Sequence, residues 1–146
     1  MISRILHPSD FSSASRPAFK KALELAKANG ATLDILHVLS PAVPMPGDGY
    51  VSPTVYDRIV ASAMAWARKQ MDALVKKARA AGVKTAGTVV EGVAADRIVK
   101  AARARRASMV VMGTHGRTGL SRFLLGSVAS RVISTAPCPV LTVRGK

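Results

Sequence analysis

The fold of this chain is decided by Val110-Val111-Met112-Gly113-Thr114-His115-Gly116-Arg117-Thr118-Gly119, continued by Leu125-Gly126-Ser127-Val128-Ala129. An apolar run ends at a glycine, a polar glycine-rich loop follows, and a Gly-Ser pair opens a second apolar, periodic segment. This order predicts a buried strand, a loop of exposed backbone N–H groups and a helix N-terminus. Such an arrangement suits a polyphosphate, because free N–H groups and the helix dipole both attract negative charge.

Length and composition indicate one domain with an aliphatic core. The chain has 146 residues, and 49% of them are hydrophobic but only 4% aromatic, which is typical of helices packed on a parallel sheet. No apolar run is long enough to span a membrane, and the N-terminus lacks the pattern of a cleavable signal. The single cysteine, Cys138, excludes an internal disulfide and fits a reducing compartment. We therefore expect a cytoplasmic protein with no membrane association.

The charge balance is strongly basic. The net charge is +14, and after Asp96 there are ten Lys or Arg residues and no Asp or Glu. This excess is consistent either with a soluble, solvated surface or with attraction to polyanions, which include nucleotide phosphates and nucleic acid. Charge alone does not choose between these partners.

The apolar pattern predicts strands and helices in alternation. Strands are expected at 2–7, 32–39, 84–90, 107–112 and 140–143, and helices at about 54–81 and 127–135. Two more helices are expected, one from a cap among residues 12–15 to residue 29 and one with its apolar face at residues 93–102. Asn29-Gly30 should end the first helix through a left-handed residue, and Gly87 should weaken the third strand. Such units have parallel strands, so the sequence predicts one doubly wound α/β domain over residues 1–146.

Two further segments lie between the second strand and the third. Residues 40–53 contain four prolines and two glycines, which predicts an irregular loop; loops of this length in compact domains are usually functional lids or disordered. In the long helix that follows, Ile59, Trp66 and Met71 fall on one apolar face. Trp66 and Met71 are therefore expected in the core rather than in a cofactor stack.

In doubly wound sheets, ligands bind at the carboxyl ends of strands where the winding reverses. The first strand ends in Pro8-Ser9-Asp10 and the fourth in the glycine loop, so Asp10 should face that loop if the two strands are neighbours. Its carboxylate could accept hydrogen bonds from ribose hydroxyls or hold a metal ion; its alternative role is to cap the first helix. Neither the Walker A pattern nor the GxGxxG spacing of dinucleotide folds is present, so a different nucleotide loop is needed.

The spacing Gly113-x2-Gly116-x9-Gly126-Ser127 resembles the ATP-binding motif of universal stress proteins. Three other segments are similar to that family: the opening strand with its aspartate, Ile5 to Asp10, the second strand around Ile35 to Val38, and the closing segment Ala136 to Leu141. The matches run from residue 2 to residue 143. The resemblance implies a five-stranded parallel sheet in the order 3-2-1-4-5 with helices on both faces, which would make strands one and four neighbours.

The resemblance also implies a site for ATP, with Mg²⁺ accompanying the phosphates. Asp10 would bind the ribose with Pro8 beside the nucleoside, and the backbone of Val38 would contact adenine. Met112 and Gly113 would line the pocket, and Gly116 would let the chain approach the phosphates. The phosphates would accept hydrogen bonds from Gly126, Ser127 and Val128, in agreement with the properties of glycine and of a helix start.

Several other polar residues carry interpretations of their own. Arg117 could neutralise a terminal phosphate or simply lie in solvent. His115 is interpreted as a hydrogen-bonding loop residue, His7 and His37 as structural residues within strands, and Cys138 as a small packing residue. Spacing alone identifies no catalytic triad and no metal cluster, so no catalytic residue is assigned.

Three functions follow from these observations. The first is an ATP-binding stress-response protein that acts as a nucleotide-dependent signalling module. The second is an enzyme that hydrolyses ATP slowly or transfers its phosphoryl or adenylyl group, for which the sequence offers no strong general base. The third is a basic nucleic-acid-binding protein, which lacks interleaved aromatic residues and any known reading motif.

The unprotected edge of the fifth strand indicates that the chain binds a protein partner. In the order 3-2-1-4-5 this strand lies at an edge, and Val140 to Val143 carry no charge or proline to protect it. Pairing with the same strand of a second copy would satisfy its backbone groups, and members of the family commonly dimerise in this way. We therefore expect a homodimer.

Overall fold

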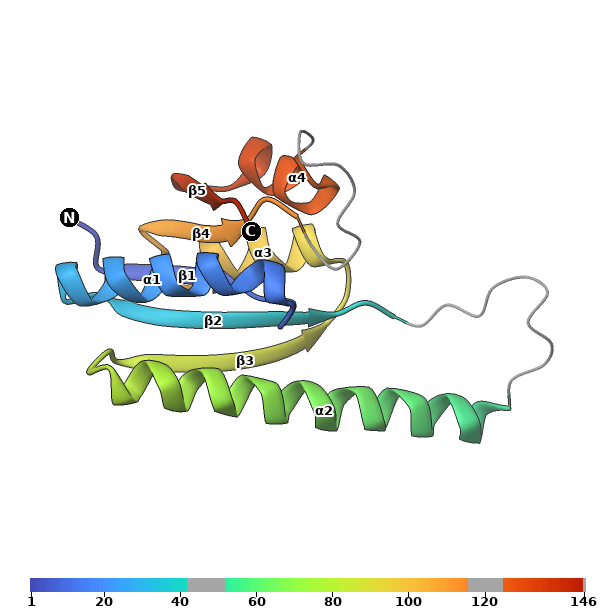
Figure 1. Cartoon of the computed structure of the whole chain (residues 1–146). Helices are drawn as coiled ribbons and strands as arrows, with labels where there is room; N and C mark the ends of the chain where they lie inside the picture. The colour runs from blue at the N-terminus through green and yellow to red at the C-terminus, as the bar shows by residue number, and fades with distance from the viewer. Residues whose placement is uncertain (42–51, 116–124, 146) are drawn as a thin grey trace.

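Strand β1 (Arg4–Pro8) is the centre of a sheet in the computed structural model, which describes residues 1–41, 52–115 and 125–145. Within these residues five parallel strands pair in the order β3-β2-β1-β4-β5, which confirms the expected topology. The other strands are β2 (Thr32–Leu39), β3 (Thr85–Glu91), β4 (Met109–Gly113) and β5 (Val140–Val143). Because all the pairings are parallel, the carboxyl ends of the strands share one edge of the sheet (Figure 1).

Four α-helices in the described part of the chain cover the two faces of the sheet. Helices α1 (Arg16–Asn29) and α2 (Pro53–Ala80) pack on one face, and α3 (Ala94–Ala104) and α4 (Ser127–Thr135) on the other. Helix α1 follows a short 3-10 turn (Ser13–Ser15) and ends at Gly30, whose φ of 62° is the left-handed conformation that the Asn-Gly pair predicts. The alternation of strands and helices is therefore as expected.

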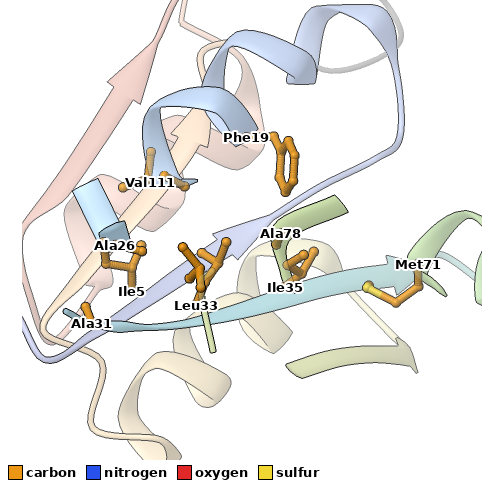
Figure 2. Packing of buried hydrophobic residues seen from close by; sticks show 11 residues of the cluster. Ile5, Phe19, Ala26, Ala31, Leu33, Ile35, Met71, Ala78 and Val111 are labelled. Atoms are coloured by element: carbon orange, nitrogen blue, oxygen red, sulfur yellow. The ribbon is translucent and has the colours of Figure 1, made fainter. Parts of the chain in front are cut away.

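The core divides into two layers because alternate residues of each strand point to opposite faces. Ile5, Leu33 and Ile35 pack beneath α1 and α2, and Figure 2 shows them with Phe19 and Met71 from these helices. On the other face, Leu6, Leu36 and Val110 pack with residues of α3 and α4, and Cys138 is partly buried against them. Central strands are thus apolar on both sides, which explains their continuous hydrophobic runs.

Two expectations about α2 need correction. The helix begins at Pro53 with Ser52 as its N-cap, because the Ser52 side chain accepts a hydrogen bond from the N–H of Val55. Met71 is buried as expected, but Trp66 is 42% exposed and Ile59 51% exposed. The long helix extends past the strands in Figure 1, so its first half has less of the sheet to pack against.

Gly87 does not interrupt β3 as the sequence suggested. The strand pairs with β2 along its length, and Gly87 lies opposite Ile35. A Cβ atom at Gly87 would lie 2.6 Å from Cγ of Met71 and 2.7 Å from Cγ2 of Val75. The glycine is therefore needed so that α2 can approach the sheet closely.

Candidate functional site

A cavity of about 210 Å³ opens at the carboxyl edge of the sheet, beside the point where β1 and β4 run next to each other. The first strand and the fourth are therefore neighbours, as a site between their ends requires. Every proposed site residue that the structure describes lines this cavity: Pro8, Asp10, Val38, Met112, Gly113, Gly126, Ser127 and Val128. Gly116 and Arg117 lie outside the described residues, as does most of the proline-rich loop at 40–53.

Asp10 follows β1 and takes part in the turn that leads to α1. Its Oδ1 accepts hydrogen bonds from the N–H of Ser12 at 2.9 Å and from the Ser12 hydroxyl at 2.6 Å. The preceding residue, Ser9, is hydrogen-bonded to β2, since its N–H donates to the carbonyl of Leu36 at 2.9 Å. The carboxylate therefore holds a local turn and borders the cavity, but it does not cap the first helix: the N-cap of the 3-10 turn is Ser12 and that of α1 is Ser15.

Three rings behind Asp10 join the ends of β1 and β2 to α2. Phe11 has a φ of 62°, a conformation that is rare for a bulky residue. Its ring stacks on His37 with centroids 4.4 Å apart and meets Trp66 edge-on at 5.7 Å. Nδ1 of His37 lies 2.7 Å from the carbonyl oxygen of Ser9. These contacts hold the turn after β1 in place, and His37 itself lines the cavity.

The end of β4 and the start of α4 are joined directly. Gly126 donates its backbone N–H to the carbonyl of Thr114 at 2.8 Å, and Thr114 donates to Val143 of β5 at 3.1 Å. A Cβ atom at Gly126 would lie only 2.9 Å from the Thr114 carbonyl oxygen, so a side chain there would push the two segments apart. The glycine of the Gly-Ser pair therefore fixes where α4 begins.

Two helix N-termini border the cavity. The N-cap of α4 is Gly126, which offers no side chain for capping, and the N-cap of α3 is Val93, whose side chain makes no capping hydrogen bond. The N–H groups of a helix's first turn have no partner within the helix, and they carry partial positive charge. Ser127 and Val128 of α4 and Ala94 of α3 line the cavity. Two helix starts thus lie beside the same cavity, a position that favours an anionic ligand.

The histidines near the site differ in their surroundings. His7 is fully buried in β1, where Nδ1 lies 2.8 Å from the carbonyl oxygen of Val111, and burial lowers its pKa to about 4. His7 is therefore neutral at pH 7, with its proton on the Nδ1 that faces the carbonyl. His115 lines the cavity, with Nδ1 2.9 Å from the hydroxyl oxygen of Thr114. Its Nε2 is buried and has no hydrogen-bond partner among the described residues.

Part of the cavity wall comes from residues that sequence patterns did not indicate. The additional lining residues are Ser9, Ser15, Leu36, His37, Ala94, Ile98, Thr114 and Ala129. Ser9 and Thr114 adjoin proposed residues and could have been found from the strand ends. Ala94 and Ile98 come from the helix after β3, and no local signal in the sequence indicates that this helix turns its first residues toward the end of β4.

The described residues offer neither a metal cage nor a membrane span. Among them, no group of three or more His, Cys, Asp and Glu side chains is placed to hold a metal ion. In the same part of the chain, no helix is both long and apolar enough to cross a membrane.

The sequence similarity to known proteins covers the whole domain. Residues 1–144 match the model of the family described as "Universal stress protein family". Universal stress protein MJ0531 of Methanocaldococcus jannaschii is 38% identical to this chain over 146 residues, which cover 99% of the chain and 83% of the relative. Universal stress protein YxiE of Bacillus subtilis is 33% identical over 148 residues, covering 99% of the chain and 100% of the relative.

Solved structures show the same fold. The structure of protein MJ0577 of Methanocaldococcus jannaschii superimposes with a TM-score of 0.80 at 28% identity, covering 100% of this chain and 98% of the other. A universal stress family protein of Burkholderia pseudomallei superimposes with a TM-score of 0.76 at 31% identity, covering 99% of this chain and 97% of the other. The likeness therefore includes both the sheet and the helices that border the cavity.

Proposed function

The chain belongs to the universal stress protein family, and on that premise we propose that it binds ATP at the carboxyl edge of its sheet. In this proposal the protein is a nucleotide-dependent module of the stress response. It works in the cytoplasm, and the bound nucleotide sets its interactions with other molecules.

One observation carries the proposal. Residues from four separate parts of the sequence, which motif spacing and strand ends single out, border one cavity: the end of β1, the end of β2, the end of β4 and the start of α4. The chemistry of the wall also fits an adenine nucleotide. Its apolar part (Val38, Ile98, Met112) suits a base, the Asp10 carboxylate suits ribose hydroxyls, and the start of α4 suits phosphates.

Each part of the nucleotide then has a counterpart in this chain. Asp10 accepts hydrogen bonds from the ribose, and the backbone N–H groups of Ser127 and Val128 donate to phosphate oxygens, with the Ser127 hydroxyl as an additional donor. Mg²⁺ would enter with the triphosphate, since this ion is commonly held by phosphates and one or two carboxylates. Gly116 and Arg117 are proposed to complete the phosphate side.

Calorimetric titration with Mg²⁺-ATP tests this proposal. We expect saturable binding by the native chain, and a loss of about tenfold to 100-fold for Ser127→Ala, because a hydrogen bond to a charged group contributes about 1.5–3 kcal/mol. Ser130→Ala, one turn further along the same helix and exposed, is the matched control and should bind like the native chain. No heat of binding at millimolar ATP would overturn the proposal.

The titration should include other adenine nucleotides. Structures of two universal stress proteins were solved in complex with cAMP and with dAMP, the second from Archaeoglobus fulgidus. Each is 24% identical to this chain, so these structures bear on the fold and leave the ligand of this chain to experiment. If ATP is the ligand, its affinity should exceed that of both monophosphates, because only ATP brings a full triphosphate to the start of α4.

We also propose that the chain forms a homodimer through β5. This strand lies at the edge of the sheet, and all four of its residues are half-buried in the single chain. A lysine at Thr142 is a typical device for blocking strand-to-strand association. Light scattering should give the mass of a dimer for the native chain and of a monomer for Thr142→Lys. A native chain that remains monomeric at working concentration would contradict the proposal.

A further inference from the structure

Basic side chains gather at the edge of the sheet opposite the cavity, where the strands begin and helices α1, α2 and α3 end. Figure 1 shows this edge on the left, with the N-terminus and the last turns of α1 and α2. We call this set the basic edge, and it consists of Arg4, Lys27, Arg79, Lys84, Arg103, Arg105 and Arg106. All seven are exposed or half-exposed.

One carboxylate of the described chain lies among these cations. Asp34, in β2, is 3% exposed, and its Oδ2 lies 3.1 Å from a guanidinium nitrogen of Arg4 and 3.9 Å from one of Arg105. Arg105 also donates a hydrogen bond to the hydroxyl of Thr88 at 2.8 Å. Asp34 thus orients two arginines and is itself screened from solvent, so the surface that a partner meets is positive.

Arg79, Lys84 and Arg106 lie near Arg4 and Arg105 because they are attached to the starts of neighbouring strands. Arg79 donates two hydrogen bonds to the carbonyl of Thr85, at 3.1 and 2.9 Å, and the carbonyl of Lys84 accepts from Leu33 at 2.9 Å. Arg106, with a φ of 51°, belongs to the turn that leads into β4. Since neighbouring strands are about 4.8 Å apart, the basic edge extends roughly 15 Å from β3 across to β4.

Helix stability explains only part of this set. A cation in the last turn of a helix is favoured by the helix dipole, which accounts for Lys27, Arg79 and Arg103. Lys84 and Arg106 lie beyond the last residues of α2 and α3, so a position in the last turn of a helix does not account for them. An exposed cluster of cations larger than helix ends require is typical of a surface that meets a polyanion.

We propose that the basic edge binds the phosphate backbone of double-stranded nucleic acid without reading its base sequence. Five of the seven cations are arginines, whose planar guanidinium matches phosphate oxygens. None of the described Phe, Tyr and Trp residues lies on this edge, so it offers no platform for stacking the bases of a single strand. The partner is therefore recognised by charge and spacing along a duplex.

An anionic membrane surface fits the same edge less well. Peripheral membrane binding uses exposed apolar side chains together with basic ones. Among the described residues, Met1 apart, the exposed large apolar side chains lie elsewhere: on the first half of α2, at the starts of α3 and α4, and at Ile133. This separation of apolar and basic surface favours the nucleic-acid backbone.

Fluorescence anisotropy with labelled DNA duplexes of about 20 base pairs and unrelated sequence, in roughly 50–200 mM NaCl, tests the proposal. The native chain should bind them with similar affinity and with a steep loss of affinity as salt rises. Lys84→Gln combined with Arg106→Gln should reduce the slope of log K against log[salt] by about 2, since each phosphate contact contributes about 0.9. At about 0.1 M salt the loss in affinity should be roughly tenfold per contact.

The matched control removes the same charges elsewhere. Arg68→Gln combined with Lys69→Gln changes two exposed residues in the middle of α2 and should leave the salt slope near the native value. Unfolding midpoints measured by circular dichroism verify that both double variants are folded. An equal loss for the two pairs, or no binding by the native chain at about 50 mM NaCl, would overturn the proposal.

Two further probes separate the partner classes. The native chain is tested in the same way with phosphatidylserine vesicles and with poly-glutamate. If it binds either of them more tightly than the duplex, and the Lys84/Arg106 variant loses that binding, the partner is not nucleic acid and the proposal is overturned. Binding of ATP by the Lys84/Arg106 variant should be native, because the cavity lies at the opposite edge of the sheet. Loss of duplex binding and loss of ATP binding are therefore measured independently of each other.

Discussion

Replacing Gly87 by alanine should destabilise the protein by about 1–2 kcal/mol. The new Cβ would lie 2.6 Å from Cγ and Sδ of Met71 and 2.7 Å from Cγ2 of Val75, well inside van der Waals contact. Met71 is 4% exposed and belongs to the core cluster, so its side chain cannot move out into solvent. Overpacking of this kind costs about 1–3 kcal/mol, and the lower chain entropy of alanine in the unfolded state offsets about 0.5–1 kcal/mol.

Urea unfolding followed by circular dichroism measures this change. The midpoint should fall while the slope m stays constant, and the melting temperature should fall by about 3–8 °C. Gly113→Ala is the matched control, since its Cβ would meet no atom closer than 3.4 Å and should change stability little. In a Met71→Ala background the cost of Gly87→Ala should fall, and what remains should come from the contact with Val75. An equal cost in both backgrounds would refute the proposed contact.

Three further substitutions test other parts of the structure. His7 has a pKa of about 4 in the folded chain against an ordinary value of 6.5, so the unfolded chain binds more protons between these two pH values. The free energy of unfolding should therefore fall by up to about 3 kcal/mol as the pH drops from about 7 to 4. The urea midpoint of His7→Asn should depend less on pH across this range than that of the native chain. Asp34→Asn should cost about 1–2 kcal/mol by chemical unfolding, because it leaves the guanidinium of Arg4 without its buried carboxylate, and an unchanged midpoint would contradict that role. Phe11→Ala removes two ring contacts and should cost about 1–3 kcal/mol while weakening ATP binding in calorimetry, since Phe11 holds the turn that carries Asp10; native affinity would argue against this positioning role.

Much of the fold could be predicted from the sequence because local signals agreed with the tertiary contacts. The predicted limits of β2, α4 and β5 coincide with the observed ones. The errors at other boundaries are small and have local causes, such as the Ser52 cap that starts α2 earlier than Thr54. Burial along α2 was harder to predict, because the apolar period that reaches Trp66 and Ile59 carries no information on where the sheet ends.

In the candidate site, too, some residues could be predicted from local sequence and others only from the tertiary structure. Asp10 and the Gly126-Ser127 pair stand at the ends of predicted elements, so residue chemistry and position along the chain are together enough to identify them. The ring stack of Phe11 and His37 has no such signal: the two residues are far apart in sequence, and they meet only because β1 and β2 are neighbours. The same is true of Ala94 and Ile98 in the cavity wall.

The sequence by itself determined the order of elements, the family and most residues of the proposed site, because hydrophobic period, turn residues and motif spacing are properties of short segments. Only the tertiary structure decided which segments meet. In the tertiary structure Gly87 allows α2 to pack closely on the sheet, although the sequence suggested that this glycine weakens β3. Arg4, Lys84 and Arg106 lie at one edge of the sheet. The physical reason is that parallel pairing sets the start of every strand at one edge, so charges that are scattered along the chain become neighbours in space.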